Sequence, residues 1–149
     1  MQKYRYILSV SVPVILAAFT AYAAGQNAAV HVEISNIRNS KGDILCHLFS
    51  SAEGFPEAHA KAFRELHAAI NADHAVCDFK DVPAGTYAFI ALHDENLNEK
   101  MDKNVLGIPQ EGYGASNNVH PLFSAPDFKD AAFGVAAGSV TPLKVKMEY

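Results

Sequence analysis

The stretch that decides the fold is TYAFIALHD, which runs from Thr86 to Asp94. Its residues alternate between two faces, with Tyr87, Phe89, Ala91 and His93 on one and Ala88, Ile90 and Leu92 on the other. A period of two is that of a β-strand. Because both faces are largely apolar, we expect this strand to be covered on both sides at the centre of a sheet, and to end at Asp94.

Shorter patterns of the same kind flank this strand. Residues 29–37 alternate, and a turn sequence at 39–42 separates them from an apolar run at 43–49, which predicts an antiparallel hairpin. Further short strands are predicted at three places: 74–79, 132–135 and 140–149. Pro142 cannot donate to a ladder, so the last strand should lie at a sheet edge or bulge. Together these strands predict an all-β fold, an antiparallel β-sandwich.

The segment from Phe55 to Asp73 is compatible with two interpretations. Pro56 at a first helical position, followed by several alanines, favours a helix over 56–70. The second interpretation ends the helix early and begins a strand near Glu65 that turns at 71–73. Periodicity does not choose between them.

Composition excludes several classes of protein. Of the 149 residues, 50% are hydrophobic and 19% are charged, which is ordinary for a globular protein and excludes a disordered or multi-span membrane chain. The 16 acidic side chains outnumber the 12 of Lys and Arg, and no basic cluster compensates, so nucleic acid is not an expected partner.

Residues 1–23 have the three parts of a secretory signal peptide. Two basic residues precede an apolar run over 7–19, and Ala21 and Ala23 supply the small residues that a signal peptidase reads. The apolar run falls short of the roughly 20 residues that a bilayer span needs. We therefore expect cleavage after Ala23, a periplasmic or secreted protein, one domain over 24–149, and no membrane span in the mature chain.

Two cysteines, Cys46 and Cys77, lie in the exported part. In an oxidising compartment they could form a disulfide. Closing a loop of this length would stabilise the fold by about 3–4 kcal/mol. The alternative is two separate small apolar core residues, since Cys buries readily. The sequence supports both interpretations equally.

Residues 95–127 have no sustained period and begin with oxygen-rich side chains. Asp94, Asn96 and Asn98 are spaced two apart, and Asp102 follows four residues later. A chain that turns around Ca²⁺ could direct these oxygens inward, together with the carbonyl of Lys100 and the carboxylate of Glu111. The net charge of these ligands is low, which predicts weak binding, with a Kd of roughly 10⁻⁴–10⁻³ M. The alternative is ordinary surface turn chemistry, in which Asn and Asp are common.

The same region carries a family resemblance, in three motifs: VPAGTYA at 82–88, HDENLN at 93–98 and GIPQEGYGASNN at 107–118. Together they resemble the exported bacterial domain-of-unknown-function family 2141. The resemblance implies an immunoglobulin-like or prealbumin-like sandwich and an exported protein, and it implies no activity. The family motif usually has Asn-Gly-Lys-x-Asp after HDEN-x, and here Glu99 stands in place of that Gly.

We expect a non-enzymatic binding protein whose partner is an unidentified ligand or envelope protein. The chain has no G-x-S-x-G elbow, H-E-x-x-H helix, C-x-x-C pair or phosphate-binding glycine loop. The alternative is a metal-assisted hydrolase of the bacterial envelope, built from His93, Asp94, Glu111 and His120. A weaker hypothesis places Zn²⁺ or Cu²⁺ between three other histidines, His59, His67 and His74.

Overall fold

The computed structural model describes residues 27–121 and 124–149, so the predicted signal peptide lies outside the described residues. Most of the regular secondary structure in the described chain is strand. Its strands are β1 (Ala28–Ser35), β2 (Asp43–Phe49), β3 (Arg64–Ala68), β4 (Ala75–Val82), β5 (Gly85–Asp94), β6 (Tyr113–Ala115), β7 (Phe133–Val135) and β8 (Val140–Lys146). Its helices are short, namely η1 (His59–Lys61), η2 (Ser116–Asn118) and α1 (Phe128–Ala131).

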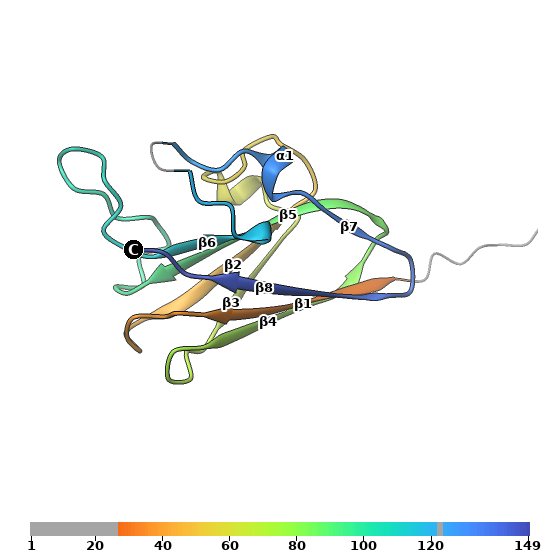
Figure 1. Cartoon of the computed structure of the whole chain (residues 1–149), viewed down its shortest axis with the longest axis horizontal. Coiled ribbons are helices and arrows are strands. Elements are labelled where there is room, and N and C mark those ends of the chain that lie inside the picture. The colour runs from red at the N-terminus through yellow and green to blue at the C-terminus, as the bar shows by residue number, and fades with distance from the viewer. Residues whose placement is uncertain (1–26, 122–123) are drawn as a thin grey trace, which may run out of the picture.

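These strands form two stacked sheets (Figure 1). One has the order β4-β1-β8, and the other has the order β3-β2-β5-β6, with β7 pairing to the start of β5. All strand pairs are antiparallel except β1 with β8, which is parallel. The predicted all-β sandwich is therefore confirmed, and β8 lies at a sheet edge as Pro142 indicated. Among the described residues, no helix combines the length and apolar character needed to cross a membrane.

Strand β5 is covered on both faces, as its sequence predicts. Tyr87, Phe89 and Ala91 join the main core between the sheets. Ala88 and Ile90 join a second cluster on the outer face, where Phe49, Ala115 and Ala131 complete it. Part of the cover on this outer face comes from Phe55 and from Phe128 at the start of α1, whose rings meet edge to face at 5.8 Å. The second apolar face of β5 thus requires cover from outside the two sheets.

The predicted hairpin of 29–37 with 43–49 is wrong. β1 pairs with β4 and β8, whereas β2 pairs with β3 and β5, so the two strands lie in different sheets. The connection crosses between the sheets through left-handed backbone at Asn36 (φ 65°) and Gly42 (φ 63°). A side chain at Gly42 would lie 1.7 Å from the carbonyl oxygen of Asp94, so the chain can pass the end of β5 only with glycine here. Alternation predicts which face of a strand is buried, but it does not identify the partner strand.

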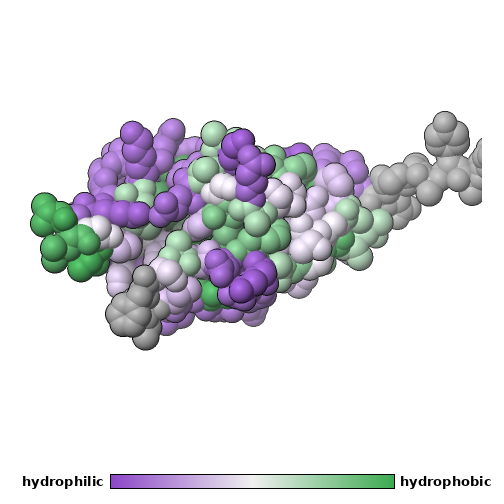
Figure 2. All heavy atoms as spheres, turned by 90° about the horizontal axis from the view of Figure 1, so that it is seen from above, coloured by the Kyte–Doolittle hydropathy of each residue, from purple (hydrophilic) through white to green (hydrophobic). Residues whose placement is uncertain are grey.

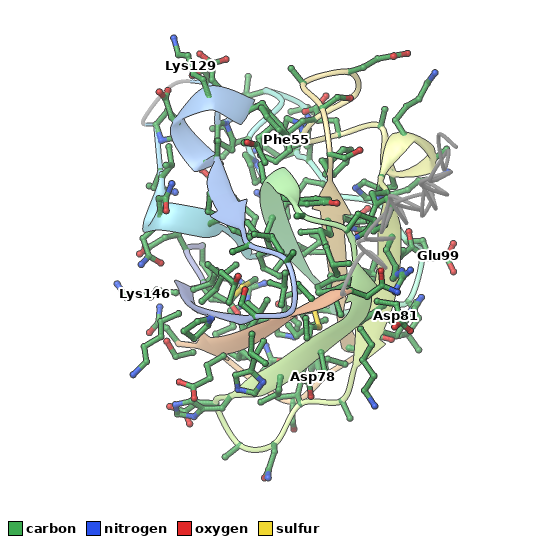
Figure 3. All side chains as sticks on the ribbon, turned by 90° about the vertical axis from the view of Figure 1, so that its right-hand side faces the viewer. Phe55, Asp78, Asp81, Glu99, Lys129 and Lys146 are labelled. Atoms are coloured by element: carbon green, nitrogen blue, oxygen red, sulfur yellow. A yellow bond between two sulfur atoms is a disulfide. The ribbon has the colours of Figure 1, made fainter. Side chains whose placement is uncertain are left out.

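Two open questions of the sequence are decided by the structure. Between Phe55 and Asp73 the second interpretation is confirmed, because helix η1 is one turn long and β3 follows, pairing with β2. Cys46 on β2 and Cys77 on β4 form a disulfide, with Cα atoms 6.6 Å apart. This bond joins the two sheets inside the main core (Figure 3).

Candidate functional site

The loop of residues 95–112 connects β5 to its antiparallel neighbour β6 and projects beyond the end of the sheet (Figure 1). We call it the 95–112 loop. It contains five of the six predicted calcium ligands, and the sixth, Asp94, is the last residue of β5. The long stretch without a period that the sequence shows also contains β6 and η2 farther along.

Two buried carboxylates hold the loop from inside. Asp94 is 1% exposed and accepts hydrogen bonds from the backbone N–H groups of Asn98 (3.1 Å) and Glu99 (2.7 Å). Glu111 is 4% exposed and accepts from the N–H groups of Glu95 (2.8 Å) and Asp102 (3.1 Å). A buried carboxylate without such donors would be costly, so these four bonds fix the path of the chain where no apolar core is available.

Two further predicted ligands, Asn96 and Asn98, contact Asp102. The side-chain amides of Asn96 and Asn98 donate to its two carboxylate oxygens, at 2.6 Å and 3.0 Å. The amide oxygens of the same two residues accept the N–H groups of Asn98 (3.1 Å) and Lys100 (2.9 Å), so each forms an Asx turn. The structure therefore brings Asn96, Asn98 and Asp102 to one place, while Asp94 and Glu111 hold the backbone around them. The calcium site itself stays a prediction.

A second part of the site comes from the β1–β2 connection and was not predicted from the sequence. Arg38 pairs with Glu95, donates to the carbonyl of Gln110 (2.9 Å), and lies over the ring of Tyr149 at 4.6 Å. Burial opposes ionisation of Glu95, but hydrogen bonds from Asn39 and Arg38 and the charge of Arg38 outweigh it, so the pKa of Glu95 lies below its ordinary value. The signal that could have identified Arg38 is its place directly beside the turn at 39–42.

His93 takes part in a chain of hydrogen bonds that ends at the C-terminus. Its Nε2 lies 2.9 Å from the carbonyl oxygen of Lys41, which can only accept, so Nε2 carries the proton. Its Nδ1 lies 2.8 Å from the hydroxyl of Tyr149, which in turn accepts the N–H of Arg38 at 3.0 Å. The ring of Tyr149 packs on Gly112, where a Cβ atom would come within 2.3 Å of a ring carbon. His93 therefore ties the loop, the β1–β2 connection and the C-terminus together.

The four residues of the hydrolase hypothesis do not share one reactive position. His93 uses both ring nitrogens in the chain just described, and the carboxylates of Asp94 and Glu111 are turned to backbone N–H groups. His120 stacks on Tyr113 with ring centroids 5.1 Å apart. Across residues 27–121 and 124–149, no group of three or more His, Cys, Asp or Glu side chains is placed to hold a metal ion.

The three histidines of the zinc or copper hypothesis also have separate surroundings. His59 stacks on His47 with ring centroids 4.0 Å apart, whereas His67 bonds to Asp43 (2.8 Å) and His74 to its neighbour Asp73 (2.5 Å). His47 is fully buried under η1, and its Nε2 lies 2.7 Å from Glu65. Burial, together with the nearby His59, lowers the pKa of His47 to about 4 although Glu65 opposes this.

The far end of the 95–112 loop has a different character, and we call residues 104–109 the tip. Val105, Leu106 and Ile108 are 102%, 79% and 53% exposed. The side chain of Asn104 closes the turn by accepting the N–H groups of Leu106 (2.9 Å) and Ile108 (3.0 Å). A bridge between Lys103 and Pro109 pairs the two arms of the loop below the tip. The chain here thus directs the carboxylates of Asp94 and Glu111 inward and the aliphatic side chains of the tip outward.

The sequence of the chain matches the model of one protein family. A family model described as an uncharacterized protein conserved in bacteria (DUF2141) matches residues 32–142, well over half of the sequence. The chain belongs to the DUF2141 family. The match includes every strand from β2 to β7 and the whole 95–112 loop, so the family resemblance of the sequence is confirmed. Comparison with the curated proteins and with the solved structures gave no significant match.

Glu99 stands where the DUF2141 motif usually has glycine, and its φ of 60° lies in the left-handed region that favours glycine. Its side chain points away from the protein (Figure 3). Glu99→Gly should therefore stabilise the fold by about 1 kcal/mol or less. The relief of backbone strain in the folded state outweighs the conformational entropy that glycine adds to the unfolded chain. Urea unfolding of the two proteins measures this difference. Lys100→Gly is the matched control, since Lys100 lacks a positive φ and should lose stability; equal losses in both variants would contradict the prediction.

His47 makes the stability of the fold depend on pH. The folded protein keeps His47 neutral down to about pH 4, whereas the unfolded chain binds a proton below its ordinary pKa of 6.5. Stability should therefore fall as the pH drops from 6.5 to 4, by on the order of 3 kcal/mol in total. The raised pKa values of His31 beside Asp78 and His67 beside Asp43 act in the opposite sense and offset part of this loss.

The contribution of His47 can be isolated by urea unfolding of variants between pH 4 and pH 7, which gives the dependence of the free energy of unfolding on pH for each protein. His47→Gln keeps a donor for Glu65 but cannot titrate, so its acid loss should be clearly smaller than that of the natural protein. Val76→Ala, an exposed substitution on β4 that changes no titratable group, is the control and should keep the natural slope of stability against pH. Identical slopes in all three proteins would show that His47 is not the group responsible.

Proposed function

We propose that this DUF2141 protein is an exported, non-enzymatic binding protein that uses the 95–112 loop as its binding surface. The N-terminal pattern of 1–23 supports export, and a disulfide between the sheets suits an oxidising compartment such as the periplasm or the medium. The binding partner is a ligand or an envelope component.

The observation that carries this proposal is the orientation of the loop. Its buried carboxylates, its asparagines and Arg38 are occupied in holding the chain, so the groups that catalysis would need are used for structure. The side chains left facing outward at the tip are aliphatic. Long irregular loops fixed on a rigid sandwich are commonly functional, and an exposed apolar surface on such a loop is suited to binding.

We further propose that Ca²⁺ orders this loop through Asn96, Asn98 and Asp102, with Asp94, Lys100 and Glu111 as the other predicted ligands. An amide or carboxylate oxygen that accepts one N–H keeps a second lone pair, so the Asx turns do not prevent ion binding. Ca²⁺ bound at these oxygens would take the place of the two amide N–H groups at the Asp102 carboxylate. Because the net charge of these ligands is low, binding should be weak, with a Kd of roughly 10⁻⁴–10⁻³ M.

Calcium should therefore raise the melting temperature of the protein relative to excess chelator, and magnesium should do so much less. Asp102→Asn removes the charge on which the proposed ligands converge. It should abolish the rise in melting temperature caused by calcium, and it should leave the melting temperature in excess chelator nearly unchanged. Asp127→Asn, at an exposed position outside the loop, is the matched control and should keep the full shift. If calcium shifts none of the three proteins, the oxygens of the loop serve turn formation alone.

The binding surface itself can be tested by photo-crosslinking in cells that export the chain. A benzophenone amino acid at Leu106 should form adducts with whatever occupies the tip. The same amino acid at Val76, an aliphatic residue on β4 that is 48% exposed, is the control and should form few. Failure to form adducts at Leu106, or equal yields at both positions, would remove the proposal that this loop is a binding surface.

A further inference from the structure

The tip is an aliphatic cap at one extremity of the molecule. Val105, Leu106 and Ile108 lie within four consecutive residues, and the space-filling view shows strongly hydrophobic atoms gathered at the outermost point of one end (Figure 2). None of the residues from 104 to 109 carries a charge. Aliphatic side chains this exposed lose favourable burial in water, so their position needs an explanation beyond packing within the fold.

Four of the five backbone N–H groups of the tip donate to acceptors within the tip itself. The N–H of Asn104 donates to the carbonyl of Ile108 (2.9 Å), and the N–H of Gly107 donates to the carbonyl of Asn104 (2.8 Å). Those of Leu106 and Ile108 donate to the side-chain oxygen of Asn104. Pro109 has no N–H to satisfy. Polar backbone groups that enter lipid must find partners within the protein, and a loop in water has no such requirement.

We propose that the tip inserts into the interfacial layer of a lipid bilayer. This inference rests on the proposed binding surface and names its occupant. A second copy of the chain or a stable protein complex is a poorer fit, because three aliphatic side chains on a projecting turn supply far less than the roughly 800 Å² that each partner contributes to a standard interface. A fluid apolar layer accepts a convex tip without a matching pocket.

The charge of the loop determines which lipids it should prefer. Between 95 and 112 there are four acidic residues (Glu95, Glu99, Asp102 and Glu111) and two lysines (Lys100 and Lys103), which leaves a net charge of −2. Anionic headgroups therefore gain no attraction from this loop, and insertion depends on apolar burial. The association should be reversible and no stronger than that of one acyl chain, about 10⁴ M⁻¹, and it should change little with salt.

The chain contains no tryptophan, so a single introduced one reports on its own surroundings. In L106W, mixing with zwitterionic phosphatidylcholine vesicles should shift the emission to shorter wavelength, and brominated lipid should quench it. V76W carries the same fluorophore on β4 and should show neither effect. Flotation of the unlabelled natural protein should agree, with vesicle binding reduced roughly tenfold to a hundredfold in L106S and unchanged in V76S. Each altered side chain is exposed, so the variants should keep the natural melting temperature.

The outcomes separate this inference from the proposal beneath it. If L106W shows no shift with any vesicle, or the same shift as V76W, lipid insertion is overturned. If crosslinking at Leu106 in cells yields one discrete protein adduct and no lipid adduct, lipid insertion is overturned while the binding surface stands. If crosslinking yields lipid adducts and the vesicle results agree, both are supported. If it yields no adducts, the proposed function fails as well.

Discussion

The structure depends on the need to cover both faces of β5. One face packs against the β4-β1-β8 sheet, and the other is closed by Phe55, Phe128 and Ala131, which come from segments outside the sheets. A strand held on both sides has a fixed end, and β5 ends at Asp94 with that side chain buried. The position of the 95–112 loop therefore follows from burial of apolar surface.

The loop itself is stabilised by polar groups. A buried carboxylate is costly unless it is fully hydrogen-bonded, so Asp94 and Glu111 stabilise only those paths of the chain that bring N–H groups to them. Arg38 and His93 add contacts from the β1–β2 connection and from Tyr149. With the polar groups used inside, the tip can present Val105, Leu106 and Ile108 without collapsing onto the sheets.

Sequence periodicity identified strands well and their partners poorly. The alternation of β1 and β5 correctly gave the buried faces, because side-chain direction in a strand is a local property. The hairpin of β1 with β2 was wrong because the register and partner of a strand depend on how two sheets stack. The spacing of Asp94, Asn96, Asn98 and Asp102 showed that this loop is rich in oxygen side chains, but it gave no sign that Asp94 and Glu111 accept hydrogen bonds from backbone N–H groups.

The sequence alone determined the fold class, the family, the location of the oxygen-rich loop and the central strand, since each rests on composition or on residues close together in the chain. The tertiary structure decided the disulfide, the partners of β1 and β2, the role of Arg38 and the outward position of the tip. These depend on residues far apart in sequence, such as Cys46 with Cys77 and Arg38 with Tyr149, whose distances are set only when the sheets pack. Local patterns specify which groups must be buried or hydrogen-bonded, and only packing specifies with what.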